Sequence, residues 1–158
     1  MIVRLVDGET GRHLWAHRTE TPFGVVSLDE RLATRIAAAL HPALRSAEID
    51  RALGMPDSDL DAQDLALRAM PSVLSLDAEG SERALHLLNS AMELDPDHAL
   101  SAALTAWVHT QRAAYRFAAE PVAERARAAA LARRALGLRC DPPALVAVGR
   151  ALSLLHDV

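Results

Sequence analysis

The first residues of the chain follow a pattern typical of two strands. Residues 2–6 are mostly apolar, residues 7–11 combine Asp, Thr and two Gly, and residues 13–19 resume an apolar pattern. Two such runs around a Gly-containing loop predict a β-hairpin, which we place within residues 1–22. Because an isolated two-stranded hairpin is marginally stable in water, we expect it to join a larger sheet, another chain or the helices that follow.

From residue 26 onward the apolar positions recur with the period of a helix. Ser27 and Glu30 form a capping box, in which each side chain can bond the other residue's backbone amide. A linking helix is therefore predicted over residues 26–54. Pro42 removes one backbone hydrogen bond, so we expect a kink or a break there.

The remaining residues, 57–158, alternate between helical spacing and short turns rich in Asp, Gly and Pro. Met70-Pro71 is expected to bend or shorten the first of these helices. The fold class is therefore predicted to be mainly α. The predicted helices cover residues 59–75, 80–94, 98–118, 121–137 and 143–156.

Small residues recur at one spacing in two of these helices. The two sets are Ala84, Leu88, Ala91 and Pro96, and, 44 residues after the first Ala, Ala128, Ala132 and Ala135, with Cys140 near the place of Pro. This spacing resembles the second helix of a tetratricopeptide (TPR) repeat. The first-helix pattern is matched more loosely, at Leu65, Ala69 and Ser72, at Ala102, Ala106 and His109, and at Leu145, Gly149 and Leu152.

The TPR resemblance implies a TPR-like α–α superhelix over residues 57–158, because a helix pair of this kind buries its apolar face only by stacking on its neighbours. The last predicted helix is of the first type, and no polar capping helix follows it. We therefore expect a homodimer through this uncapped C-terminal helix or through the hairpin, or a cover supplied by a longer parent protein.

Composition and charge exclude several classes of function. The net charge is −4, and the 17 basic residues are all Arg. This balance argues against direct nucleic-acid binding, and we interpret Arg112 and Arg116 as part of a solvated helix face. Cys140 is the single cysteine, which fits a reducing, cytoplasmic setting. No apolar run approaches the roughly 20 residues that a membrane span needs.

Candidate catalytic and metal-binding residues do not form a recognisable set. His13 and His17 share a strand face but lack a further ligand nearby, and the clustered Asp57 to Asp64 lack the Gly and Glu of a calcium loop. Cys140 has no adjacent His–Asp arrangement. We therefore predict no catalytic residues, no metal site and no cofactor. An enzyme would instead need a pocket with paired ionisable groups.

A protein or peptide partner is the interaction that the pattern favours. Five residues of the helix predicted over 98–118 fall where TPR-like proteins face their groove, and Trp107 would be the aromatic anchor. The alternative is that Trp107 packs against a neighbouring helix. The predicted partner-binding residues are Leu100, Ala103, Trp107, Thr110 and Gln111.

Residues 5–16, LVDGETGRHLWA, resemble the stretch that ends the TolB-like α/β region of certain bacterial multidomain regulators. The likeness continues through residues 43–49, 60–65 and 84–97. It implies that the chain is a hairpin remnant of an α/β region followed by a regulatory TPR tail. The resemblance points to the C-terminal fragment of a class III adenylate/guanylate cyclase, without its catalytic residues. The alternative is the tail of a winged-helix transcriptional regulator.

Overall fold

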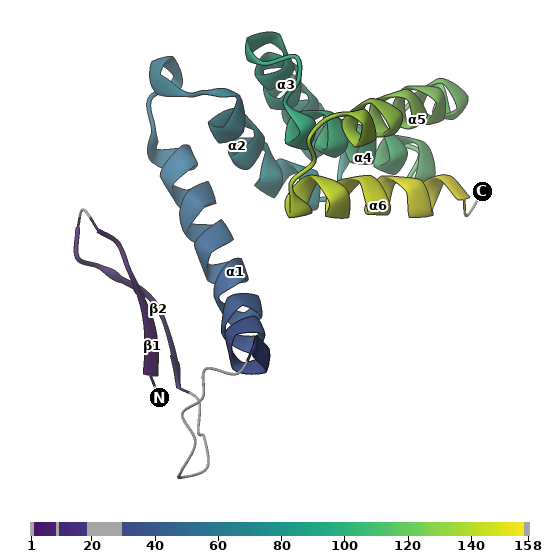
Figure 1. Ribbon diagram of the computed structural model, residues 1–158. Coiled ribbons are helices and arrows are strands. Elements are labelled where there is room, and N and C mark those ends of the chain that lie inside the picture. The colour runs from purple at the N-terminus through teal and green to yellow at the C-terminus, as the bar shows by residue number, and fades with distance from the viewer. Residues whose placement is uncertain (1, 9, 19–29, 157–158) are drawn as a thin grey trace. The chain divides into compact units, whose positions relative to one another are not determined.

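The computed structural model describes residues 2–8, 10–18 and 30–156, and the chain divides into two compact units, residues 1–51 and 52–158. The described residues contain two strands and six α-helices, so the prediction of a mainly α chain with a small antiparallel hairpin is confirmed (Figure 1). The predicted capping residue Ser27 and the boundary between residues 22 and 26 lie outside the described residues. The predicted domain limits therefore stay a prediction.

The hairpin joins β1 (Ile2–Val6) to β2 (His13–Arg18). The strands pair antiparallel from Ile2 opposite Arg18 to Leu5 opposite Trp15, with an irregularity between Leu5 and Val6. The loop closes through backbone bonds to Asp7, and Gly11 has a φ of 69°, a left-handed conformation that favours glycine. The Asp–Gly turn chemistry thus sets the hairpin.

Helix α1 (Glu30–Gly54) continues through Pro42, so the helix does not break there, and a kink stays a prediction (Figure 1). Proline costs one backbone bond, but strong helix formers flank it: three Ala and a Leu precede it at 37–40, and Ala43 and Leu44 follow. Helix propensity on both sides therefore carries the helix past a residue that, taken alone, predicts a stop.

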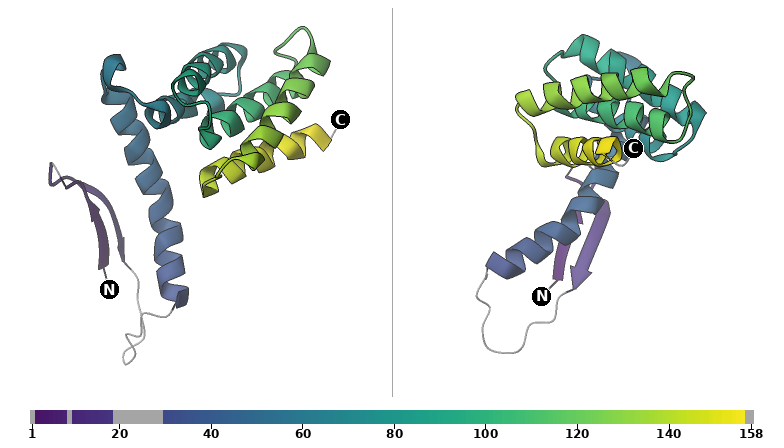
Figure 2. Two further views of the ribbon diagram at one scale, coloured as in Figure 1. Left: turned by 45° about the horizontal axis from the view of Figure 1, so that its top comes forward. Right: turned by 90° about the vertical axis from the view of Figure 1, so that its right-hand side faces the viewer.

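The second unit packs five helices: α2 (Ala62–Leu74), α3 (Ala78–Leu94), α4 (Ala99–Ala114), α5 (Pro121–Gly137) and α6 (Pro142–His156). A short 3-10 turn, η1 (Asp57–Asp59), precedes them. Consecutive helices pack together throughout, and α4 also packs against both α2 and α6 (Figure 2). Helices α2, α4 and α6 therefore form one row, while α3 and α5 fill the positions between them in the chain.

Local capping explains where two helices differ from their predicted limits. The Asp77 carboxylate accepts a hydrogen bond from the Gly80 amide at 2.6 Å, so α3 begins at Ala78 and Gly80 lies in its first turn. Helix α4 ends at Ala114, before the predicted residue 118, because Arg116 adopts a left-handed φ of 58°. Helix α2 continues through Pro71 but ends at Leu74.

The core of this unit is built largely from alanine. The six small-residue positions found in the sequence, Ala84, Leu88, Ala91, Ala128, Ala132 and Ala135, all have no exposed side-chain surface. Leu104, Val73 and Val108 are also fully buried and fill the spaces between them. Small side chains allow the helices to approach closely, which is the packing that the repeat spacing predicts.

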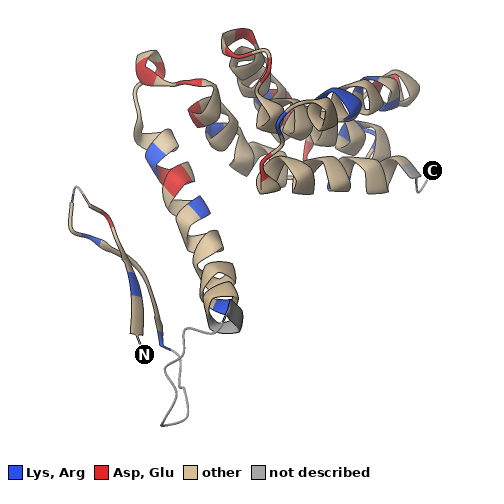
Figure 3. Cartoon of the chain, viewed as in Figure 1, with Lys and Arg blue, Asp and Glu red and all other residues tan. Residues whose placement is uncertain are grey.

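Charge is divided unevenly along this unit. Residues 57–97 hold ten acidic residues and two Arg, whereas residues 98–156 hold eight Arg and three acidic residues. Figure 3 shows the acidic residues gathered on η1, α2 and α3 and the basic residues on α5. The α4–α6 half is therefore electropositive although the whole chain is acidic.

Candidate functional site

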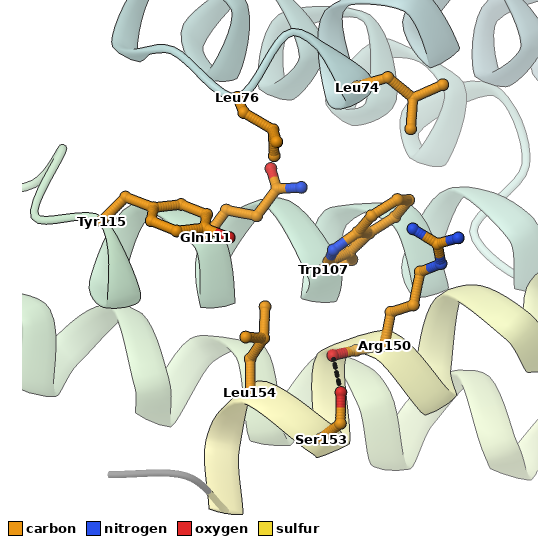
Figure 4. A pocket seen from close by; sticks show the side chains of 8 residues that line it. All are labelled: Leu74, Leu76, Trp107, Gln111, Tyr115, Arg150, Ser153 and Leu154. Carbon is orange, nitrogen blue, oxygen red and sulfur yellow. Dashed lines mark hydrogen bonds between the residues drawn. The ribbon is translucent and has the colours of Figure 1, made fainter.

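A hollow of about 210 Å³ lies between the three helices of the row (Figure 4). Helices α2, α4 and α6 and the turn after α2 supply its walls. The lining residues are Leu74, Leu76, Trp107, Gln111, Tyr115, Arg150, Ser153 and Leu154. We call this hollow the α2/α4/α6 groove. Its lining is mainly apolar and aromatic, with few polar groups, which is typical of a site that binds a ligand side chain.

Trp107 and Arg150 form the centre of one wall. The Arg150 guanidinium carbon lies 4.7 Å from the centroid of the Trp107 ring, in cation–π geometry. Only 7% of Trp107 is exposed. Among the described residues, no carboxylate pairs with Arg150 and no acceptor bonds the Trp107 indole N–H. Both groups are therefore available to a ligand.

Three half-exposed side chains form the apolar rim of the groove. Leu74, Leu76 and Tyr115 are 52%, 51% and 49% exposed. Leu76 also has a φ of 55°, a left-handed conformation that is uncommon for leucine and costs on the order of 1–2 kcal/mol. The turn after α2 therefore holds Leu76 in a strained backbone while its side chain reaches the groove.

The five predicted partner-binding residues do not all reach this groove. Trp107 and Gln111 line it, and the Gln111 amide is fixed by a 3.2 Å bond to the Val73 carbonyl. Leu100, Ala103 and Thr110 are buried elsewhere in the helix packing. Partner binding by the five together stays a prediction, and the groove adds six residues that sequence reasoning missed. Arg150 could have been found, because the loose match of Ala106 with Gly149 in the sequence aligns Trp107 with Arg150 of the helix predicted over residues 143–156.

A buried ionic cluster joins α4 to α5. Glu124 is 5% exposed, and its Oε2 lies 2.6 Å from His109 Nδ1 and 3.4 Å from Arg112 Nε. Its Oε1 accepts a hydrogen bond from Arg127 at 3.1 Å. Arg112 also donates from Nη1 to the Ser81 hydroxyl of α3 at 3.0 Å. The cluster therefore holds three consecutive helices together around one carboxylate.

The cluster corrects the interpretation of Arg112 as a solvated residue. Only 16% of its side chain is exposed, because it turns into the packing between α3, α4 and α5. The sequence carried one usable signal. Glu124 lies four residues before Ala128, in line with the buried stripe of α5, where a carboxylate needs partners. Its partners lie 12 and 15 residues earlier on another helix, so spacing alone does not identify them.

The remaining candidate residues have local roles. Asp61 caps α2 by accepting the Asp64 amide at 2.8 Å, and Asp57 pairs with Arg68. The Cys140 thiol donates to the Ala135 carbonyl, and burial, followed by the nearby Asp141 charge, raises its pKa. Such a thiol is a poor nucleophile at neutral pH.

In the part of the chain that the structure describes, no group of three or more His, Cys, Asp or Glu side chains is placed to hold a metal ion. No helix in the same residues has both the length and the apolar character that crossing a bilayer requires.

Comparison with known proteins gives one informative likeness. No family model and no solved structure matches the chain. Over 94 residues, 59% of its length, the chain is 30% identical to a Rhizobium meliloti (strain 1021) protein described as "Putative adenylate cyclase 3". The matched stretch is 16% of that protein, so the chain spans about one sixth of its relative's length. The chain is thus similar to a small part of a much longer protein.

Proposed function

We propose that the chain is a non-catalytic, TPR-like protein-interaction module that regulates a larger cytoplasmic signalling protein. The observation that carries this proposal is the row of α2, α4 and α6 around a groove with an exposed apolar rim, backed by α3 and α5. Side chains of this kind suit a peptide, because an aromatic anchor inside an apolar rim supplies most of the affinity of such contacts.

The parent that this proposal favours is an adenylate cyclase with a TolB-like region. The likeness to part of a protein described as an adenylate cyclase supports this parent over a winged-helix regulator. Incubating the purified chain with ATP or GTP and Mg²⁺ or Mn²⁺ tests the non-catalytic part. We expect no cyclic nucleotide, and its formation at a rate that scales with the chain would contradict the proposal.

The groove is tested by a pair of matched variants on an array of peptides of about twelve residues. Leu74→Arg places a charge on the groove rim, whereas Leu136→Arg does so on α5, where the leucine is equally exposed, at 51% against 52%. We expect Leu74→Arg to lose peptide binding and Leu136→Arg to keep it. Binding that survives both substitutions equally would exclude the groove.

A homodimer is the second part of the proposal. Leu145 and Val146 of α6 are 50% and 59% exposed, and Leu152 is 37% exposed. This face suits close packing against a second helix. Sedimentation of the wild type and of Val146→Arg should show a dimer that the charge disrupts, and a wild-type monomer at all concentrations would contradict it.

A further inference from the structure

We infer that the α2/α4/α6 groove takes an acidic peptide segment, in which an apolar side chain lies next to an Asp or Glu. The inference rests on the proposed function, because it names the chemistry of the partner for the same groove. The occupant places its apolar side chain against Trp107 and Leu154 and its carboxylate against Arg150.

The charge of the lining carries the choice of an acidic partner. Arg150 is the only charged residue among the eight that line the groove. No carboxylate of the described residues neutralises it, so the groove offers a cation beside apolar surface. A ligand that buried this cation without a counter-charge would pay its desolvation, whereas a carboxylate compensates it.

The geometry of Arg150 leaves its hydrogen-bonding edge free. The guanidinium carbon lies 4.7 Å from the centroid of the Trp107 ring, and the guanidinium donates no hydrogen bond to a described residue. Its N–H groups can therefore donate two parallel bonds to one carboxylate. The Trp107 indole N–H, which bonds no described residue, is a further donor for an acidic ligand.

The charge around the groove differs between its walls. Helices α4 and α6 belong to the half of the unit that holds eight Arg, four of them on α5, and three acidic residues, whereas α2 belongs to the half with ten acidic residues and two Arg. The choice of an acidic partner therefore rests on Arg150 inside the groove, which a basic segment would meet as a like charge.

The test uses the full chain and one set of peptides in three matched versions. Each peptide keeps its Leu, Ile and Phe positions, while its polar positions are all Asp/Glu, all Asn/Gln or all Lys/Arg. We expect the acidic versions to bind about tenfold more tightly than the amide versions at low salt, with most of that advantage lost near 0.5 M salt. The basic versions should bind least.

Two variants assign the preference to one residue. Arg150→Ala should bring the acidic and amide peptides to nearly equal affinity, an effect of about tenfold on the ratio of the two affinities. Arg133→Ala, which removes the same charge from an exposed position on α5 outside the groove, should leave the advantage in place.

The possible failures separate the two proposals. Equal binding of acidic and amide peptides, or an advantage that survives Arg150→Ala, would overturn the acidic ligand and leave the peptide groove intact. Binding of no peptide version would overturn both. A dimer that dissociates on Arg150→Ala without any peptide binding would show that a second copy fills the groove, and would also overturn this inference.

Discussion

In both the α2–α3 pair and the α4–α5 pair, the second helix buries a stripe of small residues. The two pairs differ in the contact that joins the helices at the start of the second helix. Aligned on Ala84 and Ala128, Gly80 of α3 corresponds to Glu124 of α5. In the first pair a Cβ at Gly80 would lie 1.9 Å from Ser75 Oγ and 3.0 Å from the Ser72 carbonyl oxygen. The helices of the first pair therefore approach this closely because Gly80 has no side chain.

In the second pair, an ionic contact joins the helices at the equivalent positions. By the spacing of the first-type helices, Ser72 and Ser75 correspond to His109 and Arg112, the two residues that surround Glu124. At aligned positions, the first pair thus has a glycine between two serines, and the second pair has a carboxylate between a histidine and an arginine. Both pairs therefore share the buried stripe of small residues, whereas the contact at the start of the second helix differs from one pair to the other.

The largest expected effect comes from removing the carboxylate of the second pair. Glu124→Ala leaves His109 and Arg112 without their partner in a site with little water, and should lower the free energy of unfolding by about 3 kcal/mol. Urea denaturation measures it. Glu93→Ala, at an exposed position of α3, is the control and should change stability little. A loss from Glu124→Ala as small as that of the control would mean that the cluster does not hold α5.

The first pair should respond next, to the smallest possible addition. Gly80→Ala forces Ser75 aside and presses on the Ser72 carbonyl, and should cost about 1.5 kcal/mol. The same substitution at Gly149, where a Cβ meets open space, should stabilise the chain by about 0.5 kcal/mol through helix propensity. Thermal unfolding of the two variants should give shifts of opposite sign, and shifts of the same sign would contradict the close approach at Gly80.

A smaller effect should follow from removing the hydrogen bond between Ser81 of the first pair and Arg112 of the second. The Ser81 hydroxyl accepts a bond from Arg112, so Ser81→Ala leaves that guanidinium one partner short. The expected loss is about 1 kcal/mol. In the Glu124→Ala background the loss should change, because both substitutions act on Arg112. Strictly additive losses in this double-mutant cycle would show that Ser81 and Glu124 do not share Arg112.

The smallest effect is a pH dependence that comes from the Asp77 cap of the first pair. The backbone bond from Gly80, then the Ser75 hydroxyl, lowers the pKa of Asp77 below its usual 3.8. A lowered folded-state pKa contributes stability above the unfolded pKa, and this contribution is lost as the pH falls through the folded pKa. Asp77→Asn keeps a good cap but should weaken this part of the acid response. An unfolding free energy that falls equally in wild type and variant between pH 5 and about pH 2 would contradict it.

Much of the helical unit could be predicted from its sequence, because its turns carry Asp, Gly and Pro and its stripes carry Ala. The limits of α5 came out as predicted, whereas α4 ended early, since Arg116 adopts a left-handed backbone that arginine seldom takes. At Pro42 the helix continues, although a break was one of the two outcomes expected there. Whether a helix ends at such a residue depends on the helix propensity and the contacts of its neighbours, and the residue type alone does not determine it.

The candidate site was less predictable than the fold. Trp107 and Gln111 were identified because they lie on one helix at helical spacing, but the groove also needs Leu76 from a turn and Arg150 from α6. Residues from three helices become neighbours only through packing, and the pairing of His109 with Glu124 has the same origin. Helical spacing within one segment predicts a face of a helix, and the groove is made of three such faces.

The peptide groove is tested most directly by following the Trp107 indole N–H in a ¹H–¹⁵N spectrum, assigned with a Trp15→Phe variant, while an acidic, leucine-containing peptide is added. We expect its resonance to shift and saturate, and the amide version of the peptide to shift it at about tenfold higher concentration. A Trp107 resonance that does not shift at any peptide concentration would contradict a groove built around this side chain. The same holds if other resonances show that the chain binds the peptide while that of Trp107 stays in place.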